Sequence, residues 1–526
     1  MVILGLGGLL GDAACAVLKD GELKAAIEEN KLDRMWKPGG LPHASINECL
    51  RLAGSSREQV GRDQVECVAV VRPFSRAPEA YMHVVLREQF PNAEIVVVEH
   101  HQAHAASAFF ASPFDEATVL TLDHAGDFRC GARWHAKDTQ IQAEREWYYP
   151  DSLGRLYGAV TQLLGYRAGA EEHKVQWISA GGDERHASLF REIVSPAARL
   201  DPAFFDGNRQ SAGGFSPKFF ERLGISEASP IPASEAPSIA RGLQKTVEEI
   251  VLGLAGEGKN LCLAGGLFLN VMLVEFLERC GRWKNVFVQP AAGNAGTALG
   301  AVYHVWHQVR RHKRRGGLES LFLGPGYGPE EIKQVLENCK LRFQYLRSTD
   351  EMLAQAVRML GEHKILAWMQ GRMEFGPRAL GNRSILASPL DSYSTENLNV
   401  FIKHREPFRK FAASVPAEVA GEYFETGPNA RYLATVGRVR PKHRKTFEAA
   451  ILGEDIIRAH VVSEKDNPLY HRLLREAGRA TGLPVLYNTS FNLFGDPLVS
   501  TPREAVRSFY SSGIDAMFVG NFLLEK

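Results

Sequence analysis

Three histidines, His100, His101 and His104, stand close together in the stretch EHHQAHAASAFF. The apolar run before them, EIVVVE, predicts a short buried strand, and the residues from His100 onward predict a helix. Positions i and i+4 share one helical face, so His100 and His104 are expected to point the same way. Two neutral imidazoles so placed can bind a divalent metal. The spacing alone leaves open a second interpretation, in which the histidines cap the helix and pack against strand ends.

A second group of candidate residues is basic and lies in GRMEFGPRALGNRSILASP and FIKHREPFRKFAASV. Glycine, proline and apolar residues are interleaved with the cations, an arrangement that favours arginines held rigidly around phosphate or carboxylate over a solvated basic surface. The segment LPVLYNTSFNLFGDP follows and predicts a strand that ends in small amide and hydroxyl groups, which can orient a nucleotide. These residues are Arg372, Arg378, Arg383, Lys403, Arg405, Arg409, Lys410, Asn488, Thr489, Ser490 and Asn492.

Glycine turns between apolar runs indicate the elements that would position these groups. The first residues predict strands joined by tight turns, with a hairpin at Asp20-Gly21, and ATVLTLDHAGDFRCGARWH repeats the scheme. The turns present Asp12, Asp123 and Asp127. Later, LCLAGGLFLN and VFVQPAAGNAGTALGA each predict a strand that leads into a glycine-lined helix start, which can hold an anion. This order favours a duplicated nucleotide-binding α/β fold.

The remaining organisation is coarser. Residues 140 to 260 are expected to be a helix-rich insertion that shapes a substrate pocket. It contains Glu172, His173 and Lys174, whose chemistry the spacing does not assign. The Gly- and Pro-rich segment FLGPGYGPEEI marks a domain boundary, with one domain over residues 1–330 and a second over residues 331–526.

Composition excludes several classes of protein. The chain has 526 residues, of which 45% are hydrophobic and 23% charged, and a net charge of +1 that favours neither nucleic acid nor an anionic membrane. The basic run RRHKRRGG is expected to be a solvated loop or helix end. Seven widely spaced cysteines without a CxxC argue against a disulfide framework and a cysteine zinc site. With no signal peptide and no membrane-spanning run, a cytoplasmic protein is expected.

At this point the sequence resembles a known family. The motifs EHHQAHAASAFF, LTLDHAGD, AGGLFLN, VQPAAGNAGTALGA, GRMEFGPRALGNRSILA, REPFRKFAASV and LYNTSFNLFGDP occur in order across nearly the whole chain. Together they resemble the O-carbamoyltransferases of nodulation and antibiotic tailoring. The segment FGPRALGNRSILA is the most specific of these motifs, and the glycine segments are individually weaker.

The resemblance implies an α/β enzyme of two domains. The N-terminal domain would have the duplicated actin-like (ASKHA) fold, and the C-terminal one a YrdC-like α/β fold, its last strand packing back on the first domain. Such enzymes join carbamoyl phosphate to ATP, with Mg²⁺, to give carbamoyl adenylate and pyrophosphate. The carbamoyl group then passes to a hydroxyl of a small-molecule acceptor at an N-terminal divalent metal, expected to be Fe(II). A monomer or homodimer is expected.

The family's functional positions carry over to residues of this sequence. The expected metal ligands are His100, His104 and Asp123, with Asn294 in the fourth position and His101 as a neighbour. The expected catalytic residues are Asp12, Arg378, Lys403 and Arg409. Nucleotide and carbamoyl phosphate would be bound by the same three cations and by Arg458, Asn488, Ser490, Gly265, Gly266, Asn270, Gly293 and Gly296.

Three departures from the family pattern stand out. Asn294 replaces a common aspartate and offers an oxygen without a charge, Gly11-Asp12 replaces His-Asp, and ENK at Glu29 to Lys31 replaces EER. We interpret them as changes on the acceptor side, because the adenylating motifs are intact. The alternatives are a tRNA- or protein-carbamoylating enzyme, which the near-zero charge disfavours, and a non-catalytic nucleotide-binding scaffold. A hydrogenase-maturation protein is disfavoured because paired CxxC motifs are absent.

Overall fold

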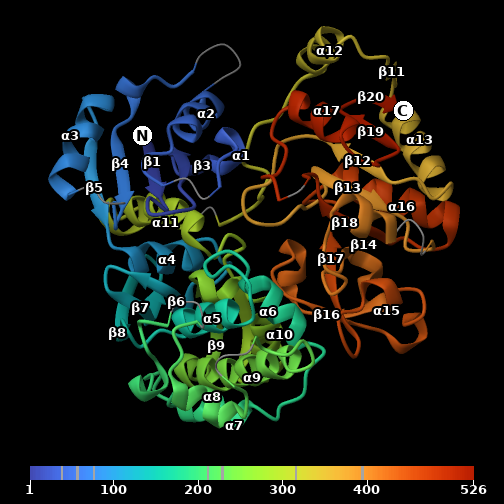
Figure 1. Cartoon of the computed structure of the whole chain (residues 1–526). Helices are drawn as coiled ribbons and strands as arrows, with labels where there is room; N and C mark the ends of the chain where they lie inside the picture. The colour runs from blue at the N-terminus through green and yellow to red at the C-terminus, as the bar shows by residue number, and fades with distance from the viewer. Residues whose placement is uncertain are drawn as a thin grey trace.

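The described residues of the computed structural model form three β-sheets (Figure 1). The description covers residues 1–526 except 37–38, 55–58, 75–77, 210–212, 227–229, 314–316, 392–395 and 494. The first sheet comes from the N-terminal part of the chain, the second from the middle, and the third from the C-terminal part, which lies to one side of the other two (Figure 1).

The first two sheets have the same topology. The first contains β1 (Val2–Gly7), β2 (Ala14–Lys19), β3 (Glu22–Glu28), β4 (Cys67–Val71) and β5 (Glu94–Val98). The second contains β6 (Glu116–Gly126), β7 (Arg129–Lys137), β8 (Gln140–Tyr148), β9 (Gly258–Ala264) and β10 (Trp283–Val288). Their orders are β3-β2-β1-β4-β5 and, read in the same direction, β8-β7-β6-β9-β10. In each, three antiparallel strands continue into two parallel ones, which confirms the predicted duplication.

Helices connect the parallel strands of each half. The first half has α1 (Asn30–Asp33), α2 (His43–Ala53), α3 (Glu79–Gln89) and α4 (His100–Phe109). The second has α5 (Leu153–Leu163), α6 (Glu172–Ser179), α7 (Ala187–Ile193), α8 (Pro217–Leu223), α9 (Ala236–Ala255), α10 (Val271–Arg279) and α11 (Thr297–Tyr303). The helix-rich insertion is therefore confirmed from α5 onward, whereas its predicted start, residues 140–148, is strand β8. Residues 210–212 of the predicted insertion and residues 314–316 of the basic run RRHKRRGG lie outside the described residues.

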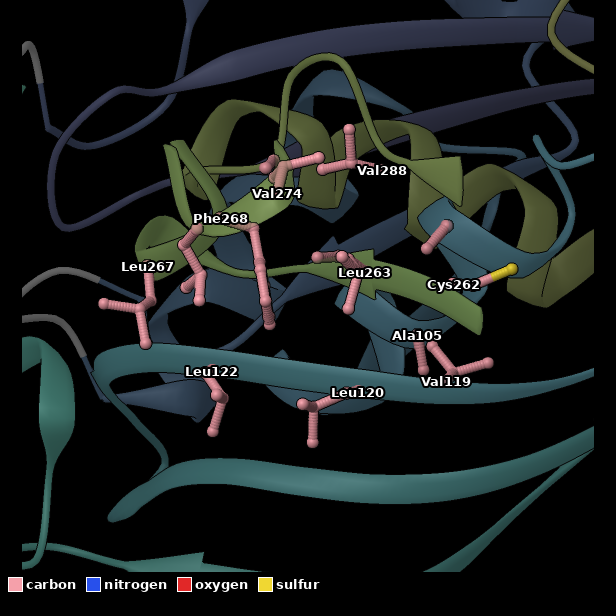
Figure 2. Packing of buried hydrophobic residues seen from close by; sticks show 14 of the residues in the cluster. Ala105, Val119, Leu120, Leu122, Cys262, Leu263, Leu267, Phe268, Val274 and Val288 are labelled. Atoms are coloured by element: carbon pink, nitrogen blue, oxygen red, sulfur yellow. The ribbon is translucent and has the colours of Figure 1, made fainter. Parts of the chain in front are cut away.

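A close crossing of α4 and α11 joins the two halves. A Cβ atom at Gly300 of α11 would lie 1.8 Å from the carbonyl oxygen of Ala103 in α4, so only glycine fits there. Around this crossing lies one continuous hydrophobic core, part of which Figure 2 shows with residues from α4, β6, β9, α10 and β10. This core fixes the position of α4 and hence of the histidines at its start.

The third sheet is built from residues after the predicted boundary. Its order is β11-β20-β19-β12-β13-β18-β14-β17-β16-β15. The strands are β11 (Gln344–Tyr345), β12 (Leu366–Met369), β13 (Arg383–Ala387), β14 (Ala412–Pro416), β15 (Phe424–Thr426), β16 (Gly437–Val439), β17 (Ile456–Val462), β18 (Leu486–Ser490), β19 (Ala516–Val519) and β20 (Phe522–Glu525). The helices are α12 (Pro329–Asn338), α13 (Thr349–Gly361), α15 (Ala420–Tyr423), α16 (Pro468–Thr481) and α17 (Pro502–Tyr510).

One prediction about this domain is wrong. The last strand, β20, does not pack back on the first domain; it pairs with β19 and β11 inside the third sheet. The short turn between β19 and β20 makes an antiparallel hairpin the nearest way for both strands to satisfy their backbone groups. All seven cysteines are described, and none of them forms a disulfide. Among the helices described, none combines the length and the apolar character that crossing a bilayer requires.

Candidate functional site

The two predicted metal-binding histidines meet Asp123 at the junction of α4 and β6. The Glu99 side chain caps α4 by accepting hydrogen bonds from the backbone amides of His101 and Gln102. His100 Nε2 lies 3.1 Å and His104 Nε2 lies 3.3 Å from Asp123 Oδ2, and the two Nε2 atoms are 3.2 Å apart. All three residues are buried. Two sequence motifs that are separate in the chain therefore form one cluster.

The spacing of this cluster fits a divalent metal. At metal–ligand bonds of about 2.1 Å, neighbouring ligand atoms lie about 3.0 Å apart in octahedral and about 3.4 Å apart in tetrahedral geometry. The three edges of the cluster, 3.1 to 3.3 Å, fall between these values. Among the described residues no other group of three such side chains was found at this spacing. The donor set, two imidazoles and one carboxylate, suits iron or zinc.

Burial and charge set the protonation of the three ligands. Burial lowers the pKa of His104 below its ordinary value and leaves that imidazole neutral. Burial is the largest single influence on the pKa of His100 and acts to lower it, but the hydrogen bond to Asp123 and the charges of Asp123, Glu99 and Asp127 together raise it above its ordinary value. Although burial opposes ionisation of Asp123, hydrogen bonds from both histidines hold the pKa of its carboxyl well below the usual value. Asp123 is thus an anion, as a metal ligand must be.

Glycines leave room for the cluster. A Cβ at Gly126 would lie 2.1 Å from the His100 ring, and one at Gly266 would lie 2.8 Å from Asp123 Oδ1. Gly265, with φ of +102°, packs on Leu122, the residue before Asp123. The predicted glycines 265 and 266 therefore lie beside the cluster of His100, His104 and Asp123, and their role in binding a nucleotide stays a prediction.

His101 belongs to the support of the cluster. Its Nδ1 lies 3.0 Å from Thr121 Oγ1 and its Nε2 lies 3.3 Å from the carbonyl of Arg129. Thr121 also accepts a hydrogen bond from Trp134 Nε1. These contacts fix α4 against β6 and β7, which agrees with the predicted neighbouring role.

Two of the residues that depart from the family pattern lie beside each other. The amide nitrogen of Asn294 is 3.5 Å from the carbonyl oxygen of Gly11, which precedes Asp12. Asp12 itself has a φ of +68° in the turn after β1. Asn294 thereby links the first hairpin to the start of α11, and its role as a metal ligand stays a prediction.

The predicted nucleotide-binding residues converge on three neighbouring strands of the third sheet. Asn488 of β18 and Arg458 of β17 both stand opposite Ala412 of β14, so the two side chains occupy one row across the sheet. Asn488 Nδ2 donates to the carbonyl of Ala379, next to Arg378, at 3.1 Å. Asn488 Oδ1 is buried and has no hydrogen-bond partner among the described residues, which leaves it available to a ligand.

The basic segment before β14 packs along the end of β18. Lys403 Nζ donates to the carbonyls of Ser490 and Asn492 at 2.9 and 2.8 Å and to Asn492 Oδ1 at 2.6 Å. Because these three contacts use the three ammonium donors, Lys403 holds the NTSFN turn in shape. Ser490 Oγ donates to the same Asn492 oxygen at 2.7 Å. Arg405, which follows Lys403, donates to Thr489 Oγ1 at 3.0 Å.

Arg378 approaches this row from a loop that crosses to the N-terminal domain. Its Nη2 lies 3.5 Å from the carbonyl of Leu269, and a Cβ at Gly293 would contact the Leu269 side chain at 3.4 Å. Asn270, the next residue, caps α10 through Leu273 N and donates to Gln244 Oε1 at 2.7 Å. Gly296 packs on Ala291 in the turn before α11. The contact between the domains therefore includes Arg378 and the Leu269 carbonyl, with Asn270 and Gly293 next to Leu269 on the N-terminal side.

Without a bound anion, the burial of several positive charges in one cluster destabilises the folded protein. This burial lowers the pKa of Arg378 to about 10, and burial with the charge of Arg409 lowers that of Arg405 to about 9. Burial lowers the pKa of Arg409, and burial with the neighbouring arginines lowers that of Arg458 well below the ordinary value. Like charges held together in this way indicate a site for a polyanion.

Several residues at this cluster were not assigned from the sequence. Lys174 of α6 forms ion pairs with Glu171, at 2.8 Å, and with Glu406, which also pairs with Arg409 at 3.8 Å. Trp177, one turn after His173, lies under the Arg458 guanidinium at 5.5 Å. The sequence signal was the charged run at the start of α6, and the partner Glu406 of its Lys174 is 232 residues away.

Lys31 corrects our interpretation of the ENK departure. It is buried and donates to the carbonyls of Glu374 and Gly376 at 2.9 and 2.8 Å, and it pairs with Glu28 at 2.9 Å. The Glu374 carboxylate in turn accepts backbone hydrogen bonds from Leu380, Asn382 and Arg383. Lys31 therefore holds the loop that carries Arg378, so this change does not lie on the acceptor side.

Replacing Lys31 by methionine should lower the free energy of unfolding by about 3–5 kcal/mol, because a buried carboxylate and two carbonyls lose their partner. Urea denaturation followed by circular dichroism measures this loss. The matched control is Lys24→Met, because Lys24 is partly exposed and its ion pair with the exposed Glu22 is solvated, so the change should alter stability by less than about 1 kcal/mol. Equal losses in the two variants would contradict the role of Lys31.

Comparisons with known proteins give a consistent result. A family model described as carbamoyltransferase N-terminus matches residues 80–303, and one described as carbamoyltransferase C-terminus matches residues 357–526. The uncharacterized protein sll1178 of Synechocystis is 33% identical over 100% of this chain and 96% of its own length. Nodulation protein NolNO of Sinorhizobium fredii is 31% identical over 98% of this chain and 79% of its own length. The 3'-hydroxymethylcephem-O-carbamoyltransferase of Amycolatopsis lactamdurans is 28% identical over 80% of this chain and 79% of its own length.

Proposed function

The chain belongs to the carbamoyltransferase family, and on this premise we propose that it is an ATP-dependent O-carbamoyltransferase acting on a small-molecule hydroxyl. Carbamoyl phosphate and ATP react at the cation cluster of the C-terminal domain, with Mg²⁺ accompanying ATP. The carbamoyl group then passes to the acceptor near His100, His104 and Asp123. The similarity to a cephem O-carbamoyltransferase supports a hydroxyl as the accepting group.

The proposed adenylation has a definite atom balance. For pyrophosphate to leave ATP, a carbamate oxygen must attack the α-phosphate, so carbamoyl phosphate first loses its phosphate to water. The products of this half are carbamoyl adenylate, pyrophosphate and inorganic phosphate. Attack by the acceptor hydroxyl on the carbamoyl carbon then releases AMP and one proton. Adenylation supplies the leaving group that carbamate lacks.

The observation that carries the proposal is the row of Arg458 and Asn488 across the sheet, with the half-buried side chains of Arg378, Arg405 and Arg409 beside it. Guanidinium groups in fixed positions bind phosphate through paired hydrogen bonds and stabilise charge that develops on it. Lys403 keeps the NTSFN turn in place, and Lys31 keeps the Arg378 loop in place. Lys403 and Lys31 can therefore influence the reaction without contacting the substrate.

A divalent metal held by His100, His104 and Asp123 would act as a Lewis acid on the carbamoyl carbonyl. The chain's own contribution is to keep the Asp123 carboxylate ionised, the His104 imidazole neutral and all three ligands in register. His101 and Gly126 set the position of the histidine-bearing face of α4, and Glu99 fixes the start of the helix.

The test is ATP–pyrophosphate exchange with labelled pyrophosphate, which needs no acceptor. The full chain should incorporate label into ATP when carbamoyl phosphate is present and not when acetyl phosphate replaces it. Release of AMP during an acceptor screen, followed by mass spectrometry, then identifies the acceptor class. A chain that binds ATP but shows no exchange under any of these conditions would be a nucleotide-binding scaffold, and the proposal would fail.

A further inference from the structure

His173 occupies the seam between the domains, at the start of α6. The Nε2 atom of its imidazole is buried and has no hydrogen-bond partner among the described residues. Leaving a buried polar atom unsatisfied costs about 1–3 kcal/mol, so such an atom in a folded protein requires an explanation. Two other buried histidines have a partner, His460 in Ser414 at 3.0 Å and His471 in Glu418 at 3.0 Å, whereas in the described part of the chain His104 Nδ1 and His443 Nε2 share the unpartnered state of His173 Nε2.

The surroundings of His173 are cationic. Burial is the largest influence on its imidazole, followed by the charges of Arg409, Arg378, Lys174 and Arg458, and together they lower its pKa to about 3. The nearby carboxylates do not compensate, because Glu171 and Glu406 are both paired with Lys174. The side chain is therefore a neutral imidazole surrounded by positive charge.

Three segments that carry predicted site residues meet at this point. Lys174 pairs with Glu406 of the basic segment, and Trp177 lies against Arg458 of β17. Gln176 of the same helix accepts a hydrogen bond from Val271 N at 3.0 Å, two residues after the Leu269 carbonyl that Arg378 contacts. The N-terminal part of α6 is therefore fixed relative to each of the arginines around His173.

We infer that His173 is a further ligand of the anion at this cluster, donating its Nε2–H to a phosphate oxygen of the nucleotide or of pyrophosphate. A polyphosphate would neutralise Arg378, Arg409 and Arg458, whereas Lys174 is already paired with Glu171 and Glu406. It would also give Nε2 the partner that the described residues do not supply. The contact comes from the N-terminal domain, whereas most of the cations come from the C-terminal one. The inference rests on the proposed function, and it adds a binding residue that the sequence motifs do not assign.

The test uses inorganic pyrophosphate as the probe, titrated into the full chain in a calorimeter. His173→Ala should weaken binding about 10- to 100-fold, the effect of losing one hydrogen bond to a charged group. His173→Gln should restore most of the affinity, because its amide can donate from a similar position. The matched control is His186→Gln, which changes a histidine of the same domain that is bonded to Glu235 at 3.0 Å and should leave the affinity unchanged.

Stability separates a binding role from a structural one. Since Nε2 makes no hydrogen bond within the described protein, His173→Gln should not shift the urea midpoint downward without pyrophosphate. Wild-type affinity in the alanine variant, with weakened affinity in Arg458→Ala, would overturn the inference and leave the proposed function intact. If the wild-type chain bound neither pyrophosphate nor ATP, the proposed function itself would fail.

Discussion

Replacing Arg378 by alanine will reduce carbamoyl phosphate-dependent ATP–pyrophosphate exchange by at least about 100-fold. One charge-assisted hydrogen bond contributes about 1.5–3 kcal/mol, and a guanidinium fork makes two. The residue also joins the reacting domain to the Leu269 carbonyl of the other domain. Arg378→Lys should recover little, because lysine keeps the charge but not the fork.

The control for this variant is Arg358→Ala, which removes an exposed arginine paired with Glu362 and should exchange at the wild-type rate. The stability of Arg378→Ala gives a second measurement. Burial depresses the pKa of Arg378 to about 10, so the folded protein binds that proton less tightly than the unfolded chain does. The resulting loss of stability is constant at pH values below about 10, where Arg378 is charged in both the folded and the unfolded chain, and it declines at higher pH. The alanine variant should therefore be no less stable at pH 7.5, and undiminished exchange would refute the role of Arg378.

Replacing His104 by alanine will remove bound metal and carbamoyl transfer while ATP–pyrophosphate exchange continues. His104 supplies one of three ligand atoms, and the other two cannot complete a stable site. Elemental analysis of the purified protein measures occupancy, and the acceptor assay measures transfer. Because His100 and Asp123 form a hydrogen-bonded ion pair when no metal is bound, acid should favour that pair and lower the occupancy of the wild-type protein.

His83→Ala is the matched control for the metal variant. His83 also stands in a helix four residues from a potential partner, Glu79, but it is exposed. Its loss should change neither metal content nor transfer. If the His104 variant and the wild-type protein carried the same metal at the same occupancy, the histidines would be structural. That result would favour the helix-capping interpretation of HHQAH.

The parts of the fold that the sequence predicts well are those with local signals. The alternation of glycine turns and apolar runs indicated both three-stranded units, and the i, i+4 spacing placed His100 and His104 on one face of α4. Asp123 follows a buried strand in a motif that resembles a known family. Each of these depends on neighbours within one strand, one turn or one helix.

The parts that could not be predicted depend on contacts between distant segments. Lys31 meets its acceptors 343 and 345 residues later in the chain, and no local pattern distinguishes it from a surface lysine. His173 is defined by arginines more than 200 residues away. Similarly, the pairing of β20 with β11 depends on which strands come together at that edge of the third sheet.

The crossing of α4 and α11 also limits which changes outside the histidine cluster the domain can tolerate. Counted from the first residue of each helix, Ala103 and Gly300 hold the same position, and they are in contact. A Cβ at position 300 would lie 1.8 Å from the carbonyl oxygen of Ala103, the residue before His104. Any side chain at position 300 would therefore push α4 away and displace the histidines at its start, although residue 300 is not part of the cluster.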